Sequence, residues 1–127
     1  MSAGYNRVSV CSLAAVALLA VAGCAPSGVS YNKEVQPILR KHCSECHAPG
    51  EKCFLLTGLD TTRYQALMKG GKFGPLVIPG DALTSALNML VEGRVHSSIQ
   101  MPHGKAKLAD KEIEILKVWV NEGAKNN

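Results

Sequence analysis

The chain has 127 residues and a formal net charge of +4, and this length suits one small domain. Arg7 is the only charged side chain in residues 1–23, so the other 104 residues carry 13 basic and 10 acidic side chains, a net charge of +3. A charge this small and scattered gives no support to nucleic-acid binding.

Residues 1–23 have the features of an export signal. Arg7 precedes an apolar stretch, Val8–Ala22, that ends in small residues, and this order is typical of a signal peptide. The stretch is shorter than the roughly 20 residues that a membrane-spanning helix needs, although a short uncleaved anchor stays an alternative. We therefore expect the protein to be exported to the periplasmic side of a bacterial membrane.

Cys24 is the expected lipidation site. Val21–Cys24 reads V-A-G-C and resembles a bacterial lipobox, in which the cysteine becomes the first residue and carries a diacylglyceryl group. Each buried methylene contributes about 0.8 kcal/mol, so two or more acyl chains anchor a protein stably. In enterobacterial lipoproteins, an Asp directly after the lipidated cysteine keeps the protein out of the outer membrane. The residue in this position is Ala25, which weakly favours the outer membrane. The alternative is ordinary cleavage after Ala22. Residues 24–30 would form a tether.

Tyr31–His42 is expected to be a helix. Val35, Ile38 and Leu39 recur at helical spacing on one face. Pro37 is tolerated only if it falls in the first turn, and it would kink a longer helix.

The next five residues, Cys43–His47, read C-S-E-C-H. The C-x-x-C-H spacing is typical of covalent haem attachment. Cys43 and Cys46 would form thioether bonds with the haem vinyl groups, and His47 would ligate the iron. A zinc site would need a second Cys/His pair and a thioredoxin-like pair would need a βαβ pattern, and neither is evident. The sequence therefore predicts one covalent haem c.

One cysteine has no role in this scheme. Of the five cysteines, Cys11 lies in the leader and Cys53 is left over. An odd thiol in an exported protein suggests pairing between chains or a buried, inert side chain. If Cys24 is not lipidated, a Cys24–Cys53 disulfide becomes available.

The rest of the chain predicts helices separated by long loops. Ala48–Leu59 has no periodic pattern and is expected to be irregular, Asp60 is expected to cap the helix after it, and Gly70–Gly71 to end that helix. Three further helices are expected, over residues 61–69, from residue 81 or 84 to residue 92, and over residues 110–121. No strand pattern of useful length is present.

Met101 is the candidate for the second axial position of the iron. It lies in a loop before a stiff proline, and a thioether ligand raises the reduction potential. Met68 and Met89 fall on apolar helical faces and are expected in the core. His96 and His103 are the competing ligands, and an open iron is the remaining alternative.

Two further interpretations concern the surroundings of the haem. Backbone carbonyls around Gly74–Pro75 are candidates to accept from the second ring nitrogen of His47. Lysines that flank the expected haem loops would present a positive rim to an acidic redox partner, or form an ordinary solvated surface. These lysines are Lys69, Lys72, Lys105 and Lys107.

In order and spacing, these motifs resemble the small monohaem class I cytochrome c family, and most closely its planctomycete-type form. The pattern covers nearly all of Tyr31–Ala124. It comprises Tyr31, Val35-x-Pro37-Ile38-Leu39, Cys43-x-x-Cys46-His47, Leu59-Asp60, Gly70-Gly71, Gly74-Pro75, Pro79-Gly80-Asp81, Met101-Pro102, Leu108, Glu112-Ile113, Leu116, Trp119-Val120 and Gly123-Ala124.

The resemblance implies an all-α cytochrome c fold over residues 31–124, with about four helices, long loops around one haem, and terminal helices that cross beside it. Residues 125–127 would be a tail. It also implies His47 and Met101 as axial ligands and single-electron transfer between transient redox partners, without enzyme activity. Separately, we expect a monomer that contacts the membrane through the lipid on Cys24. The alternatives are a haem enzyme or gas sensor with an open or displaceable sixth site, and a cytochrome subunit of a larger oxidoreductase.

The chain departs from the family pattern at two positions. Ala109 replaces the usual Ser or Thr, so the capping box with Glu112 is expected to be lost and Asp110 to cap the last helix. Cys53 is not a feature of the family.

Overall fold

The computed structural model describes residues 28–127, so the predicted leader, Cys24 and most of the tether lie outside the described residues. The described part contains six α-helices and no strand, and its single β-bridge joins Gly71 to Gly74. The helices are α1 (Gln36–His42), α2 (Ser44–His47), α3 (Lys52–Thr57), α4 (Tyr64–Lys69), α5 (Ala86–Glu92) and α6 (Asp110–Asn121). The all-α prediction is confirmed, with more and shorter helices than the four expected. Over residues 28–127, none of these helices is long and apolar enough to cross a membrane.

The helix predicted over Tyr31–His42 is present, but its hydrogen-bond pattern changes before the proline. A π-helix, η1 (Tyr31–Val35), leads directly into α1, so Pro37 falls in the first turn of α1. The missing N–H of a proline is tolerated there. The hydroxyl of Ser30 accepts a hydrogen bond from the Lys33 N–H and caps η1.

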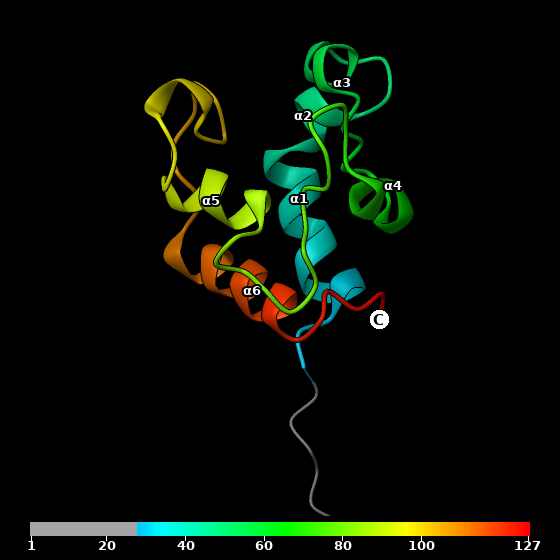
Figure 1. Cartoon of the computed structure of the whole chain (residues 1–127), viewed down its shortest axis with the longest axis vertical. Helices are drawn as coiled ribbons and strands as arrows, with labels where there is room; N and C mark the ends of the chain where they lie inside the picture. Colours follow the sequence, from blue (N-terminus) through cyan, green and yellow to red (C-terminus); the bar gives the residue numbers. More distant parts are fainter. Residues whose placement is uncertain (1–27) are drawn as a thin grey trace, which may run out of the picture.

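The N-terminal helical segment and α6 pack together at the base of the molecule (Figure 1). Tyr31 and Trp119 are fully buried, and their ring centroids lie 5.6 Å apart. Tyr64 meets Tyr31 edge-on at 5.1 Å. The Trp119 indole N–H donates to the Lys125 carbonyl at 3.0 Å. Aromatic pairs in such geometry stabilise beyond the area they bury, so this cluster fixes how the two ends of the domain cross.

The C-terminal residues are bound to the start of the domain. The Asn127 side chain accepts from the Tyr31 N–H at 2.8 Å, and its carbonyl accepts from the Asn32 N–H at 3.0 Å. The Val29 N–H donates to Glu122 at 2.8 Å. The segment expected to be a tail therefore closes the base of the fold.

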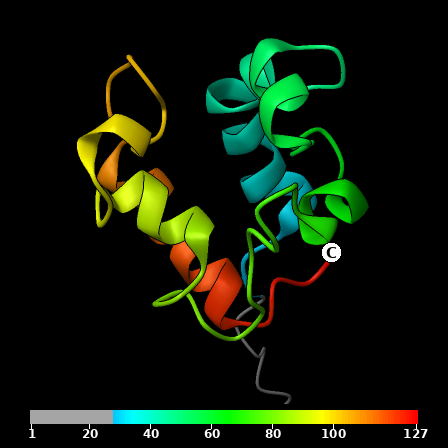
Figure 2. The same cartoon turned by 45° about the horizontal axis from the view of Figure 1, so that its top comes forward.

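The helices divide into two groups that meet at α6 (Figure 2). One group contains α1 to α4, and the other contains α5 with the loop of residues 94–108, which holds the short 3-10 helix η2 (Ser97–Ile99). Between α4 and α5, residues 75–78 have no regular structure, as expected for a short apolar segment between turns.

Helix α3 contradicts the expectation that Ala48–Leu59 is irregular. It buries no residue, and Leu55 and Leu56 are both exposed, so it lacks the apolar periodicity from which a helix is predicted. It is stabilised instead at its C-terminal end. Gly58 takes a left-handed conformation there, and the Lys72 ammonium donates to the Leu55 and Leu56 carbonyls.

Asp60, expected to cap a helix, and Asp81, one of two expected helix starts, each form a turn before the helix. The Asp60 carboxylate accepts from the N–H and hydroxyl of Thr62, and Asp81 accepts in the same way from Thr84. Such local side-chain hydrogen bonds compete with helix formation. Helices α4 and α5 therefore begin at Tyr64 and Ala86, later than predicted.

The start of α6 corrects the expectation for its cap. Ala109 is the N-cap residue and Asp110 is the first helical residue. Ala109 has no side-chain oxygen, but the Glu112 carboxylate still accepts its N–H at 3.0 Å. Half of the capping interaction is therefore retained.

Glu112 also connects α6 to the end of α1. Its carboxylate lies 2.9 Å from the Lys41 ammonium and 3.0 Å from the His42 imidazole. The hydrogen bond from Lys41, opposed by partial burial and reinforced by His42 and the Ala109 N–H, lowers the pKa of Glu112 from 4.5 to about 2. The folded state therefore favours the ionised carboxylate.

This depressed pKa predicts a pH-dependent contribution to stability. It should be fully present above about pH 4.5 and be lost as the pH falls toward about 2. Glu112→Gln should lower the free energy of unfolding near pH 7 by on the order of 1 kcal/mol, and the difference from wild type should shrink below pH 4.5. Urea unfolding at a series of pH values measures both.

Glu114→Gln is the matched control, because Glu114 lies on the same helix and its side chain is 63% exposed. Its effect should be small at every pH. If the difference in the free energy of unfolding between wild type and Glu112→Gln stayed constant from pH 7 to pH 2, the ionic role of Glu112 would be contradicted.

Candidate functional site

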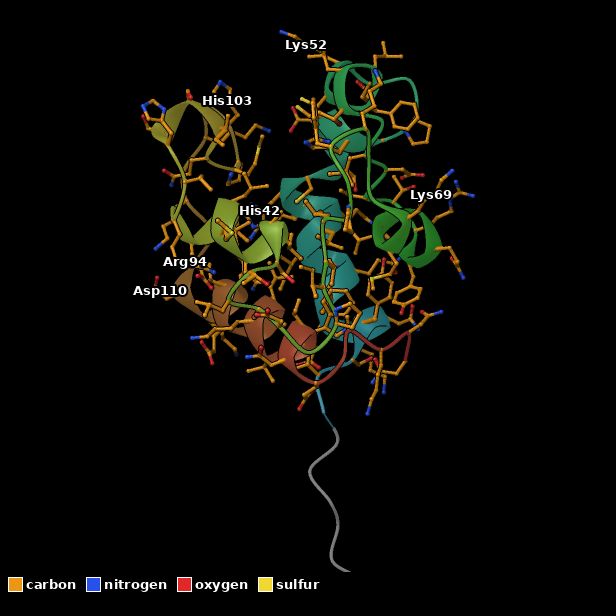
Figure 3. All side chains as sticks on the ribbon, viewed as in Figure 1. His42, Lys52, Lys69, Arg94, His103 and Asp110 are labelled. Carbon is orange, nitrogen blue, oxygen red and sulfur yellow. The ribbon has the colours of Figure 1, made fainter. Side chains whose placement is uncertain are left out.

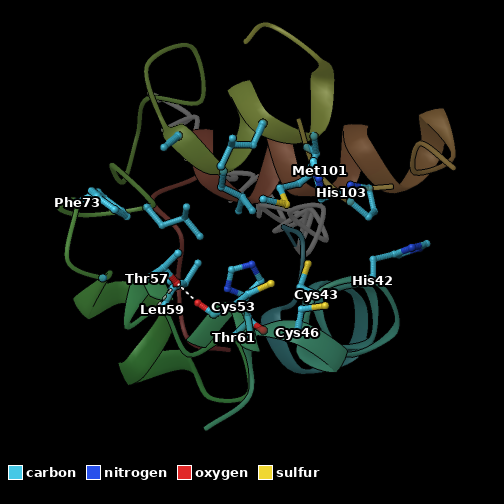
Figure 4. A pocket seen from close by; sticks show the side chains of 18 of the residues that line it. His42, Cys43, Cys46, Cys53, Thr57, Leu59, Thr61, Phe73, Met101 and His103 are labelled. Carbon is cyan, nitrogen blue, oxygen red and sulfur yellow. Dashed lines mark hydrogen bonds between the residues drawn. The ribbon is translucent and has the colours of Figure 1, made fainter. Parts of the chain in front are cut away.

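A cavity of about 240 Å³ lies between the two groups of helices (Figure 4). Its lining is mostly apolar. The polar lining residues come from the C-S-E-C-H segment with His42 before it, from α3 and the residues after it, and from the loop after α5. The apolar lining includes Leu59, Phe73, Pro75, Leu76, Ala86, Leu87, Leu90 and Val91.

The C-S-E-C-H segment supplies one wall of the cavity. Cys43 ends α1, with its N–H bonded to the Leu39 carbonyl at 2.8 Å. The next turn is α2, in which Cys46 and His47 both donate their N–H to the Cys43 carbonyl at 3.1 and 2.9 Å. All three predicted haem-binding residues of the motif therefore reach one cavity.

His47 is the buried imidazole of this wall, with 8% of its surface exposed. Burial lowers its pKa, and a backbone interaction with Leu59 opposes that shift. Nδ1 is buried without a hydrogen-bond partner, and the backbone that acts on the imidazole is that of Leu59 rather than that of the Gly74–Pro75 region. A neutral imidazole is the form that binds a metal, and an acceptor behind its second nitrogen fixes its orientation.

A network of short backbone contacts holds Leu59 in this position. The Thr57 hydroxyl donates to the Cys53 carbonyl at 2.7 Å and accepts from the Leu59 N–H at 3.2 Å (Figure 4). The Thr57 carbonyl accepts from the Lys72 N–H at 2.7 Å. Gly71 fits against this segment only because it has no side chain, since a Cβ there would lie 2.5 Å from the Thr57 carbonyl oxygen.

Met101 approaches the cavity from the side opposite the two cysteines, and its thioether points inward (Figure 4). Its backbone N–H donates to the Leu90 carbonyl at 3.1 Å, which fastens the loop to α5. His103 lies beside it in the lining, whereas the His96 ring is bonded to Ser98 outside the lining. Met68 packs against the core, as expected.

The residues present fit a covalently attached haem. Two thiols, an imidazole with an unpartnered buried nitrogen and a facing thioether surround a mostly apolar space. A structural zinc ion would require several His, Cys or acidic ligands together. Residues 28–127 contain no group of three or more such side chains that could hold a metal ion.

Sequence reasoning missed the position of Cys53. It lines the cavity on α3, near Cys46. Burial is the main cause of its raised pKa, followed by this contact. Cys43 is more strongly affected, because burial raises its pKa to about 11. The sequence contained only an unexplained cysteine seven positions after Cys46 as a signal.

Most of the lysines considered for a positive rim have partners inside the chain. Lys72 binds the end of α3, Lys105 pairs with Glu45 within the C-S-E-C-H segment, and Lys107 lies 3.8 Å from Asp110. Lys69 projects away from the molecule (Figure 3). The ordinary explanation, a solvated surface with local ion pairs, therefore accounts for these lysines better than a dedicated positive rim.

A protein-family model described as Planctomycete cytochrome C matches residues 43–103. The match begins at the first cysteine of the C-S-E-C-H segment and extends past Met101, so it contains the whole donor set. No curated protein and no solved structure matched the chain significantly.

The close approach at Gly71 predicts the effect of a single methyl group. Gly71→Ala would force the residue 71–74 turn away from the Thr57–Leu59 segment behind His47. We expect a loss of about 1–3 kcal/mol in the free energy of unfolding of the haem-loaded protein, measured by urea denaturation. Lys69→Ala is the control just before this turn, because Lys69 is exposed and lies outside the cavity lining, and it should change stability by less than about 0.5 kcal/mol. Equal stability of Gly71→Ala and wild type would show that this close approach does not occur.

Proposed function

The chain belongs to a cytochrome c-like family, and we propose from this premise that it carries single electrons with one haem c, bound through Cys43 and Cys46 and ligated by His47 and Met101. At the level of the family, it is a haem-binding electron-transfer protein. The axial ligands, the number of haems and the absence of catalysis belong to the proposal.

One observation carries the proposal. A single cavity receives the two thiols and the imidazole from one wall and the Met101 thioether from the other. Haem c supplies an iron centre that accepts and releases one electron. If His47 and Met101 both bound the iron, they would leave no coordination position for a substrate, which favours a carrier over an enzyme.

The chain's own residues would keep this centre unchanged during electron transfer. Leu59, facing the imidazole, would restrain the orientation of His47. The hydrogen bond from Met101 to Leu90 would hold the thioether in place in both oxidation states. The apolar lining would exclude water and, with the thioether, favour the reduced form.

The cellular setting is proposed from the sequence. The protein would be exported, anchored by lipid on Cys24 at the periplasmic side of a membrane, with the outer membrane weakly favoured. It would act as a monomer and exchange electrons with redox proteins through small, transient contacts.

The axial ligation is tested by Met101→Ala in the matured protein. Ferric wild type should be low-spin by electron paramagnetic resonance and show the near-infrared sulfur-to-iron band, and the variant should lose that band. Its reduction potential should fall, since a thioether stabilises ferrous iron. Met89→Ala is the control, because Met89 lies outside the lining of the cavity, and it should retain the band.

Other spectra would support the alternatives. High-spin ferric wild type, or rapid carbon monoxide binding by its reduced form, would indicate an open site and favour a haem enzyme or gas sensor. A low-spin Met101→Ala variant with wild-type spectra would show that another residue, such as His103, is the ligand.

The anchor is tested by Cys24→Ser in the full-length chain. Wild type should sediment with membranes and incorporate a labelled fatty acid, because multiple acyl chains bind lipid stably. The variant should lose both properties while the haem spectrum stays unchanged. Wild type recovered without label in the soluble fraction would show cleavage without lipidation.

A further inference from the structure

An ion pair connects the two walls of the cavity. Glu45 lies on α2, between the two cysteines of the C-S-E-C-H segment, and its carboxylate binds the ammonium of Lys105. Lys105 lines the cavity from the loop after α5, four positions beyond Met101. The two charged residues therefore come from the two separate groups of helices in Figure 2.

This contact has no equivalent in the described part of the chain. Of the hydrogen bonds and ion pairs there, it is the only one that joins residues 43–47 to the loop of residues 94–108. The ion pairs of Lys41 and His42 with Glu112 reach α6 and leave the loop free. The ion pair between the walls is therefore the polar contact that links the two candidate ligand segments directly.

We propose that the Glu45–Lys105 ion pair positions the Met101 loop against the C-S-E-C-H segment, and thereby keeps the Met101 thioether opposite His47 in competition with other ligands. The inference rests on the proposed function, because it takes His47 and Met101 as the axial ligands. It gives Lys105 a role within the chain rather than toward a redox partner.

The loop that carries Met101 has few other restraints. The Met101 N–H is bonded to the Leu90 carbonyl, and Lys107 lies 3.8 Å from Asp110. Both contacts tie the loop to its own side of the cavity. Helix η2 buries no residue, and residues 103–107 are all exposed. Because segments with few buried contacts open more easily than the core, a restraint from the opposite wall matters most here.

The expected effect is modest, because both charged groups are partly solvated. In the structure, 69% of the Glu45 side chain and 48% of the Lys105 side chain are exposed. Ion pairs of this kind shift a local equilibrium by about 1.5- to 5-fold. Such a shift changes the stability of a whole domain little, but it is measurable in the competition between Met101 and an added ligand. Dissolved salt should weaken the contact, because salt screens exposed charges.

Added imidazole measures how firmly Met101 is held. In the matured ferric protein, imidazole competes with the thioether, and its binding is followed as loss of the near-infrared sulfur-to-iron band. At pH 8 imidazole is mostly neutral, so its affinity does not report the overall charge of a variant. It reports how readily the Met101 loop moves away.

We expect Glu45→Gln and Lys105→Gln each to bind imidazole about 1.5- to 5-fold more tightly than wild type. The double variant should match the single variants, because either substitution already removes the ion pair. Exchanging the two charges, as Glu45→Lys with Lys105→Glu, should bring the affinity closer to that of wild type than either charge reversal alone.

Lys107→Gln is the matched control, because it removes a lysine from the same loop whose partner, Asp110, lies on the same side of the cavity. It should bind imidazole as wild type does. Unchanged affinity in both single variants, or effects that add in the double variant, would overturn the proposal. A lower urea midpoint with wild-type imidazole affinity would also overturn it, because the ion pair would then stabilise the domain without positioning Met101.

Salt gives an independent measurement on the wild-type chain. Raising the NaCl concentration from about 0.05 M to about 1 M should increase the imidazole affinity of wild type more than that of the Glu45→Gln, Lys105→Gln double variant. Equal responses to salt would refute the positioning role. A ferric wild type without the sulfur-to-iron band would instead refute Met101 ligation, so failure of the proposed function is distinguishable from failure of this inference alone.

Discussion

Cys43, Cys46 and His47 have to reach the same cavity from a single helical turn, and the rest of the structure depends on this constraint. The end of α1 supplies the first cysteine, and α2 turns the second cysteine and the imidazole to the same side. One turn cannot also hold the ring of His47 in place. The backbone of Leu59 acts on that imidazole, and the turn at Gly71 packs closely against the Thr57–Leu59 segment.

The opposite wall of the cavity depends on a different part of the core. The cluster of Tyr31, Tyr64 and Trp119 fixes the crossing of the N-terminal segment with α6. Helix α5 packs on α6 and holds the Met101 loop through the Leu90 carbonyl. The distance between the two axial ligand candidates is therefore set by aromatic packing at the base of the fold. A covalent group attached to one wall can meet a thioether from the other only if that packing is maintained.

The helical class, Tyr31–His42 and α6 were predictable because apolar periodicity is a local signal. A fixed motif and a loop methionine likewise indicated residues that the structure brings to one cavity. Helix α3 was not predictable in this way, because it buries no side chain and is stabilised by Gly58 and by Lys72 from a distant turn. The residue facing His47 and the neighbour of Cys46 were missed for the same reason. Both depend on how α3 packs on α2, and no periodicity in the sequence encodes that contact.

The helix that sequence reasoning missed joins the two chemical halves of the candidate site. Cys53 contributes its thiol to the neighbourhood of Cys46, and its carbonyl accepts the Thr57 hydroxyl that in turn holds the Leu59 N–H. A displacement of α3 would therefore act near the Cys46 sulfur and behind the imidazole of His47 together. With few buried contacts of its own, α3 is also among the elements that move most easily. The geometry of the candidate haem-binding wall thus depends on one short helix that hydrogen bonds from Thr57 and Lys72 stabilise.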